Sequence, residues 1–199
     1  LQADAGAIVF QGNLINNMSS NKRSLLGIAR TFQITSLMLD MSTLENVMLA
    51  VQAHSGHSYC FWQDARQDDQ LVEPAVKVLK QVGLLERKNI ITRELSHGEH
   101  RQLEIAMALA TQPKLLLLDE PMAGMGAEET QKLIAILKKL KTGKTMILIE
   151  HDMNAVFSLA DRITVMVYGK IIATGPPKEI RANQKVKAAY LGDEELQTC

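Results

Sequence analysis

The segment from Lys114 to Glu120 reads KLLLLDE, and Pro121 follows it directly. A short, wholly apolar run is typical of a strand buried on both faces, as in a parallel sheet that is covered by helices. In open α/β sheets, ligands bind outside the carboxyl ends of the strands. The segment therefore predicts a buried strand that presents the carboxylates of Asp119 and Glu120 where ligands bind.

A second apolar run, Thr145 to Ile149 (TMILI), also ends in polar residues, which are Glu150, His151 and Asp152. The residues between the two runs include a segment with helical periodicity, 127–141. We therefore expect a strand–helix–strand unit with polar side chains at equivalent strand ends. A generic unit of this kind, with solvated acids at its strand tips, is the alternative interpretation of these residues alone.

The composition is that of an ordinary globular protein, with 46% hydrophobic and 22% charged residues among 199. The 22 basic and 22 acidic residues balance, so nothing in the charge favours a nucleic-acid partner. No apolar run approaches the roughly 20 residues that a membrane-spanning helix needs. The two cysteines, Cys60 and Cys199, have no metal-site spacing, and we expect a reducing cytosolic compartment without a structural disulfide.

The first part of the chain is predicted to contain short strands. Residues 7–16 (AIVFQGNLIN) indicate a hairpin, residues 22–29 a short helix, and residues 28–33 (IARTFQ) a strand that ends in Gln33. The side-chain amide of Gln33 can serve as a ligand of a metal or a water molecule. A solvated side chain is the alternative.

The middle of the chain is predicted to be helical. Residues 42–54 begin with a capping-box pattern of Ser42 or Thr43 with Glu45, and residues 68–82 have one apolar face. This change in composition predicts three parts, which are an N-terminal part of the core (1–41), a helical insert (42–92) and the rest of the core (93–199).

The run Ser96-His97-Gly98-Glu99 opens the next predicted helix, within residues 94–112. Ser96 and Glu99 have the spacing of a capping box. Exposed amides and small residues at a helix N-terminus can bind an anion. Most such helix starts serve only as caps, which is the alternative here. The rest of the chain predicts a helix at 152–159, a hairpin over 161–168 and 170–174, a turn at 175–177, and short helices at 178–182 and 186–191.

Taken together and in order, these motifs resemble those of the ATP-binding cassette (ABC) ATPase family, over nearly the whole chain. The matching segments are the Q-loop (RTFQ, 30–33), the signature motif (LSHGEHRQLEIAMALA, 95–110), the Walker B strand with its glutamate (LLLLDEP, 115–121) and the switch-histidine segment (IEHD, 149–152). The resemblance implies an α/β fold, namely an ABC-type nucleotide-binding domain of the P-loop NTPase class with a helical subdomain.

The resemblance also implies roles for individual residues, with ATP and Mg²⁺ as cofactors. Asp119 and Gln33 would contact the metal, Glu120 would act as the general base, and His151 would contact the γ-phosphate. The chain would form a homodimer or heterodimer with a second ABC ATPase subunit. The resemblance implies that Ser96, His97, Gly98 and Glu99 would contact the nucleotide that this second subunit binds.

The helical insert would dock transmembrane permease subunits, so the chain would lie in the cytoplasm, peripheral to the inner face of the cell membrane. The segments ARTFQ, DEPMAGMGAEET and EHDM and the closing AAYLG are similar to the ATPase subunits of branched-chain amino acid importers. LSHGE and DEPMAGM lean towards the related urea importers.

Departures from the family pattern lead to a further expectation. His97 stands at a glycine position of the signature motif, and Gly126 stands where the D-loop has an aspartate. No G-x-x-x-x-G-K-[ST] loop (Walker A) occurs in the 199 residues. We therefore expect an N-terminally truncated cassette that is inactive alone. The alternative is a non-transport or non-catalytic ABC-type fragment that acts as a protein-interaction module.

Overall fold

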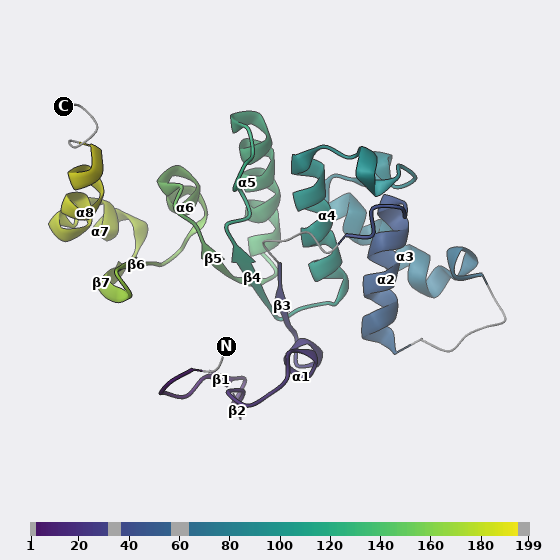
Figure 1. Ribbon diagram of the computed structural model, residues 1–199, viewed down its shortest axis with the longest axis horizontal. Helices are drawn as coiled ribbons and strands as arrows, with labels where there is room; N and C mark the ends of the chain where they lie inside the picture. The colour runs from purple at the N-terminus through teal and green to yellow at the C-terminus, as the bar shows by residue number, and fades with distance from the viewer. Residues whose placement is uncertain (1–2, 32–36, 57–63, 195–199) are drawn as a thin grey trace. The chain divides into compact units, whose positions relative to one another are not determined.

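The computed structural model describes residues 3–31, 37–56 and 64–194 of the chain (Figure 1). Gln33, the predicted Q-loop glutamine, lies outside the described residues. The chain divides into two compact units, Leu1–Ile149 and Glu150–Cys199.

A parallel sheet lies at the centre of the first unit (Figure 1), with its strands in the order β3–β4–β5. The strands are β3 (Ile28–Arg30), β4 (Leu115–Asp119) and β5 (Thr145–Ile149). Both apolar runs of the sequence therefore form strands, as predicted, and the leucine run occupies the middle of the sheet.

The two faces of β4 are not equally buried. Successive side chains of a strand point to opposite faces, and Leu116 and Leu118 are only 0% and 1% exposed. Leu115 and Leu117 are partly exposed, and Ile147 of β5, which pairs with Leu117, is 51% exposed. The prediction of a strand buried on both faces is thus confirmed for the face of Leu116 and Leu118 and is wrong for the face of Leu115 and Leu117, which the described residues cover only in part.

The remaining elements of the first unit are helices and one hairpin. The α-helices are α1 (Ser20–Leu25), α2 (Thr43–Ser55), α3 (Asp69–Val82), α4 (His97–Ala110) and α5 (Ala127–Lys141). Short 3₁₀ helices lie at Ala65–Gln67, Leu85–Arg87 and Thr92–Glu94. The predicted N-terminal hairpin is present as antiparallel β1 (Val9–Phe10) and β2 (Asn13–Leu14).

Helices α2, α3 and α4 pack against one another through side chains that are fully buried, including Val47, Leu79 and Leu103. The predicted caps are confirmed for α2, because Ser42 accepts from the backbone of Glu45 while the Glu45 side chain accepts from Ser42. Helix α3 ends at Gly83, which adopts the left-handed conformation with φ 79°.

Helix α1 is shorter than predicted. It ends at Leu25, whereas the sequence predicted a helix to residue 29. Gly27 has φ 100° and breaks the helix. Its carbonyl accepts from the backbone N–H groups of Lys114 and Leu115, at 2.8 and 3.0 Å. These bonds start the pairing of β3 with β4, so the chain enters the sheet at Ile28.

The second unit contains α6 (Met153–Leu159), β6 (Ile163–Val167), β7 (Lys170–Gly175), α7 (Pro177–Ala182) and α8 (Gln184–Glu194). The predicted hairpin is confirmed as the antiparallel pair β6–β7. The predicted turn at residues 175–177 is wrong in extent, because Gly175 ends β7 and Pro177 already starts α7, where its fixed φ suits the first helical position.

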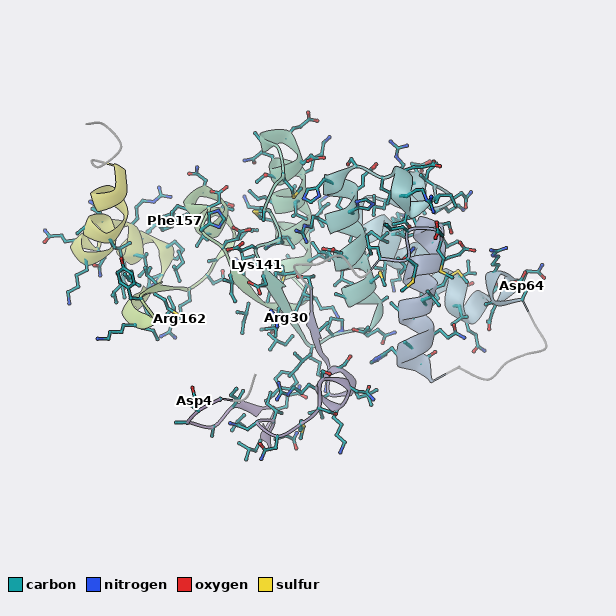
Figure 2. The ribbon with its side chains drawn as sticks, in the orientation of Figure 1. Asp4, Arg30, Asp64, Lys141, Phe157 and Arg162 are labelled. Atoms are coloured by element: carbon teal, nitrogen blue, oxygen red, sulfur yellow. The ribbon has the colours of Figure 1, made fainter. Side chains whose placement is uncertain are left out.

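The core of this unit is small and apolar. Its buried members are Ile163, Val165, Ile180 and Val186. The guanidinium of Arg181 lies 4.5 Å from the ring centre of Phe157, which is labelled in Figure 2. A cation placed over an aromatic face in this way adds an electrostatic contact to the apolar packing.

Asn46 is the most connected buried polar side chain of the helical region. It is 0% exposed. Its Nδ2 donates to the carbonyls of Met38 and Ser42 and to Thr92 Oγ1, at 3.0 to 3.1 Å, while its Oδ1 accepts from the Met38 backbone N–H at 2.8 Å. The side chain of Asn46 thus links the segment at Met38 to the segment at Thr92, which lie far apart in the sequence.

We predict that Asn46→Ala lowers the free energy of unfolding by about 2 to 4 kcal/mol, because it leaves several buried polar groups unpaired. The measurement is urea denaturation followed by circular dichroism. As a control, the exposed Lys77→Ala on α3 changes stability by less than about 0.5 kcal/mol. A loss below about 1 kcal/mol for Asn46→Ala would contradict this account.

Candidate functional site

The carboxyl end of β4 presents two adjacent acids, as predicted. Asp119 is the last residue of the strand, and its Oδ2 lies 2.9 Å from Nη2 of Arg30 on the neighbouring β3. Figure 2 labels Arg30 at this part of the sheet. Arg30 is the side chain that the sequence alone did not connect with Asp119.

The chain leaves the sheet at Glu120. This residue has φ 45°, which is uncommon for a residue other than glycine. Its backbone N–H donates to the carbonyl of Ile149 at 2.9 Å, so the pairing of β4 with β5 continues for one residue beyond Asp119. The backbone at the predicted general base is therefore fixed by its neighbour strand.

The N-terminus of α4 carries the predicted capping box. Ser96 Oγ accepts from the Glu99 backbone N–H at 3.2 Å, and Glu99 Oε2 accepts from the Ser96 backbone N–H at 2.9 Å. Nε of Arg87 lies 2.9 Å from Glu99 Oε1. Glu99 is thus engaged on both oxygens, and Ser96 and His97 remain exposed at the helix start.

Two side-chain contacts connect this helix start to the segment that follows β4. His97 Nε2 lies 3.2 Å from the carbonyl of Ala123. Ser96 Oγ lies 3.3 Å from Oε1 of Glu129, near the start of α5. The signature-like run and the loop after Glu120 are therefore neighbours in space.

A cavity of about 440 Å³ lies beside the α4 N-terminus. Its lining combines charged side chains of both signs with small residues, including Arg87, Ser96, Gly98, Glu129 and Lys132. An exposed helix N-terminus next to a hollow can receive an anionic group through its free N–H groups and the helix dipole.

His151, the predicted switch histidine, lies at the start of the second unit. Its side chain is 76% exposed, and its backbone N–H donates to Oε2 of Glu150 at 3.2 Å. Asp152 then caps α6 by accepting from the backbone of Asn154 and Ala155. His151 belongs to the second unit, whereas Asp119 and Glu120 belong to the first. Gln33 lies outside the described residues.

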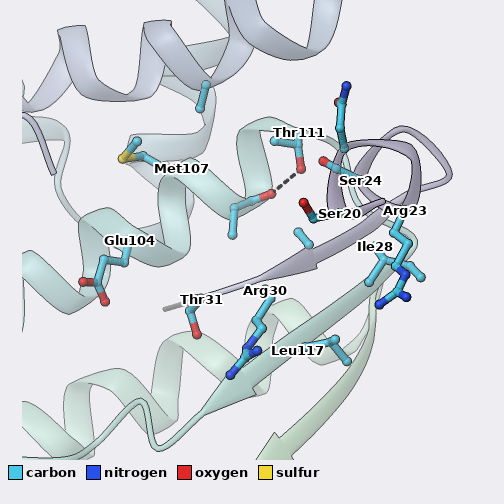
Figure 3. A pocket seen from close by; sticks show the side chains of 14 residues that line it. Ser20, Arg23, Ser24, Ile28, Arg30, Thr31, Glu104, Met107, Thr111 and Leu117 are labelled. Atoms are coloured by element: carbon cyan, nitrogen blue, oxygen red, sulfur yellow. Dashed lines mark hydrogen bonds between the residues drawn. The ribbon is translucent and has the colours of Figure 1, made fainter. Parts of the chain in front are cut away.

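A larger cavity of about 680 Å³ lies between α1, β3 and α4 (Figure 3). Its lining is mainly apolar. Figure 3 shows Glu104 at one end and Ser20 and Ser24 at the other. The carboxylate of Glu104 is 8% exposed and lies 3.0 Å from Nη1 of Arg101, and burial raises the pKa of Glu104 above its ordinary value of 4.5.

Two further structural features bear on ligands. Among the described residues, no group of three or more His, Cys, Asp or Glu side chains could hold a metal ion. A nucleotide-bound Mg²⁺ typically needs only one or two carboxylates besides the phosphates, and Asp119 and Glu120, both partly exposed, are two such groups at the end of β4. None of the helices in the described ranges is long and apolar enough to cross a bilayer.

Sequence reasoning found the acids and the helix start but missed their partners. Arg30 lies in the predicted strand before Gln33. The sequence does not tell that this strand pairs with the strand of Asp119, so it could not place Arg30 beside that residue. Glu129 was recognised only as part of a helix. Its position three residues after Gly126 is a possible helix-start signal, since Glu129 Oε2 accepts from the Gly126 backbone N–H at 3.4 Å.

Comparison with known proteins reveals clear relatives. A family model described as "ABC transporter" matches residues 1–123, and one described as "Branched-chain amino acid ATP-binding cassette transporter" matches residues 170–195. The high-affinity branched-chain amino acid transport ATP-binding protein BraF of Pseudomonas aeruginosa is 37% identical, over 96% of this chain and 78% of that protein. The protein LivG of Escherichia coli, which bears the same description, is 34% identical over 94% and 76%.

Solved structures give the same result for the fold. The ADP conformation of an ATP-binding cassette of an ABC transporter superimposes with a TM-score of 0.80 at 30% identity, and covers 96% of this chain and 79% of that chain. A nucleotide-free cassette gives a TM-score of 0.79 at 30% identity, over 96% and 78%. The α/β fold predicted from the sequence is thereby confirmed.

The buried Glu104 leads to a prediction about pH. A carboxyl whose pKa is raised by folding stabilises the protein below its unfolded pKa, and this contribution is lost as pH rises through the folded pKa. Wild type should therefore lose stability relative to Glu104→Gln as pH increases from about 4 upward. Gln keeps an oxygen that can accept from Arg101.

The measurement is urea denaturation of both proteins at a series of pH values. The exposed Gln81→Ala on α3, which removes no ionisable group, serves as the control, and its difference from wild type should stay flat. A difference between Glu104→Gln and wild type that is constant, or that moves in the opposite direction, would rule out a raised pKa for Glu104.

Proposed function

We propose that this chain, which belongs to the ABC transporter family, is the ATP-hydrolysing subunit of an importer of branched-chain amino acids. We further propose that these 199 residues, in which no G-x-x-x-x-G-K-[ST] loop occurs, are inactive alone and act only in the assembled transporter. The printed names of the relatives BraF and LivG support this cargo, as does the match of residues 170–195 to the branched-chain amino acid cassette model. The observation that carries the ATPase part is the pair Asp119–Glu120 at the carboxyl end of the central strand β4.

In this proposal Asp119 binds the metal and Glu120 is the general base. Asp119 would hold the Mg²⁺ of Mg-ATP directly or through water, and the metal would supply positive charge for the phosphate oxygens at this edge of the sheet. Arg30 Nη2 lies 2.9 Å from Asp119 Oδ2, so Asp119 would exchange this partner for the metal. Glu120 accepts a proton from the water that attacks the γ-phosphorus, and ADP leaves.

The family resemblance implies roles in the same reaction for His151 and Gln33, which we include in the proposal. The His151 side chain, which is exposed, contacts the γ-phosphate and helps to position the attacking water. Gln33 contacts the metal and the water and transmits their state to the membrane subunits. Catalysis of phosphoryl transfer depends mainly on such positioning and on electrostatic stabilisation of the phosphate oxygens.

The start of α4 serves a second ABC ATPase subunit. Ser96 Oγ and the backbone N–H of Gly98 donate to the γ-phosphate of a nucleotide held by that subunit. Glu99 keeps its capping bonds with Ser96, and His97 stays on the carbonyl of Ala123. Each nucleotide is then contacted from both subunits, so that hydrolysis requires their association.

The helical region, residues 42–92 between the core parts 1–41 and 93–199, docks the transmembrane permease subunits. The tight packing of α2 and α3 on α4 supports this role, because a rigid helical body can transmit force from the α4 N-terminus to a partner. The chain then lies in the cytoplasm at the inner face of the membrane. Cargo is bound by other subunits, so transport assays with leucine and with urea separate the two importer classes.

We predict that Glu120→Gln lowers the rate of ATP hydrolysis by the assembled transporter by roughly 10²- to 10⁴-fold, which is the usual contribution of a general base. The amide keeps the shape of the side chain but cannot take the proton. The measurement is phosphate release in membranes or detergent with saturating Mg-ATP, together with the nucleotide affinity, which should be retained.

Glu179→Gln is the matched control for this experiment, because Glu179 is an exposed glutamate on α7, outside the helical region 42–92. Its rate should equal that of wild type. If Glu120→Gln hydrolyses ATP at the wild-type rate, Glu120 is not the general base. If the wild-type assembly binds no Mg-ATP, the ATPase proposal itself fails.

A further inference from the structure

The carboxylate of Glu129 lies at the N-terminus of α4, although Glu129 belongs to α5. Its Oε1 lies 3.3 Å from Ser96 Oγ, and its Oε2 accepts from the Gly126 backbone N–H at 3.4 Å. Both distances are long for hydrogen bonds that involve a charged group. Glu129 is therefore held at this place by weak bonds that a stronger ligand can replace.

Gly98 makes this position possible. A Cβ atom added at Gly98 would lie 2.7 Å from Oε1 and 2.8 Å from Cδ of Glu129. Such contacts are shorter than van der Waals distances, so any larger residue at 98 would force the carboxylate out. The Glu129 carboxyl group thus lies in the space that the missing side chain of Gly98 leaves open, directly against the first turn of α4.

A helix N-terminus attracts negative charge through its free N–H groups and its dipole. Glu99 Oε2 already accepts from the Ser96 backbone N–H, and the carboxylate of Glu129 is a second negative charge, against Ser96 Oγ and Gly98. A phosphate that approached the same groups would meet this carboxylate at close range, and two negative charges at one place repel each other. The carboxylate has to move before a phosphate can bind there.

Lys132 offers the displaced carboxylate a partner. It lies three residues after Glu129 on α5, which is a spacing at which helix side chains meet. At present Lys132 Nζ lies 2.7 Å from Oε1 of Glu128. The pKa of Lys132 is raised above its ordinary value mainly by the hydrogen bond and charge of Glu128, with a smaller contribution from the charge of Glu129. Lys132 and Glu129 both line the same cavity.

We propose that Glu129 is a built-in anion that occupies the α4 N-terminus until the terminal phosphate of a nucleotide on the second subunit displaces it, and that Lys132 then receives its carboxylate. The inference rests on the proposed function, since it names a positioning residue for the same site. It goes further by making closure of the two subunits an exchange of one anion for another. The concentration of Mg-ATP needed for activity is then set partly by Glu129.

The test uses the assembled transporter and measures kcat and KM for Mg-ATP. Glu129→Gln removes the charge but keeps an oxygen that can accept from Ser96, and it should lower KM by roughly two- to fivefold, the size of a surface charge interaction. Lys132→Met should raise KM by roughly twofold, because the displaced carboxylate loses its partner. In the Glu129→Gln background, Lys132→Met should have no effect.

Lys139→Met, which changes an exposed lysine farther along α5, is the control and should leave KM unchanged. If Glu129→Gln does not fold, Glu129→Ala carries the same prediction of a lower KM. An unchanged or higher KM for the Glu129 variant would overturn the inference. So would an effect of Lys132→Met that persists without the Glu129 charge.

The two proposals fail in different ways. If wild type does not hydrolyse Mg-ATP, the proposed function is wrong and the inference falls with it. If wild type is active and Glu120→Gln is inactive while the Glu129 variant matches wild type, the ATPase proposal holds and only the role of Glu129 is wrong.

Discussion

The pairing of β4 with a parallel strand on each side is the constraint on which the rest of the structure depends. Its register places Arg30 opposite Leu117 and Asp119 opposite Ile149. The hydrogen bond from the Glu120 backbone N–H to the carbonyl of Ile149 extends the same register to Glu120, where the chain leaves the sheet. Because Leu116 and Leu118 are buried, a slip by one residue could bring Asp119 into the core in place of Leu118 and turn both leucines to the other face. Apolar burial thus fixes the place of the two carboxylates.

A second set of contacts ties the start of α4 to the segment after β4. His97 meets the carbonyl of Ala123, and Ser96 and Gly98 meet Glu129. The helix start proposed to receive a partner's phosphate therefore touches the loop that follows Glu120, the proposed general base of its own site. Through these contacts, phosphate binding at the start of α4 could change the position of the loop after Glu120, and so couple the two proposed nucleotide sites. The route consists of polar contacts of 3.2 and 3.3 Å, which are weak and can exchange partners at small cost in free energy.

Much of this fold could be predicted from the sequence, and the exceptions have physical causes. Strand β5 and helix α5 have the predicted bounds, because their periodicities are unbroken and their ends are polar. The capping box at Ser96 followed from spacing alone. The end of α1 did not, since Gly27 bonds to Lys114, which lies far along the chain. The contact of Glu129 with Ser96 spans 33 residues and depends on how two helices meet, which no local pattern encodes.

The most direct test of the account is a high-resolution structure of the assembled transporter that carries Glu120→Gln, with Mg-ATP bound. The account predicts a terminal phosphate within hydrogen-bonding distance of Ser96 Oγ and the Gly98 backbone N–H of the opposite subunit, with the Glu129 carboxylate turned towards Lys132. A nucleotide bound with Glu129 still against Ser96, and with its terminal phosphate remote from α4, would contradict it.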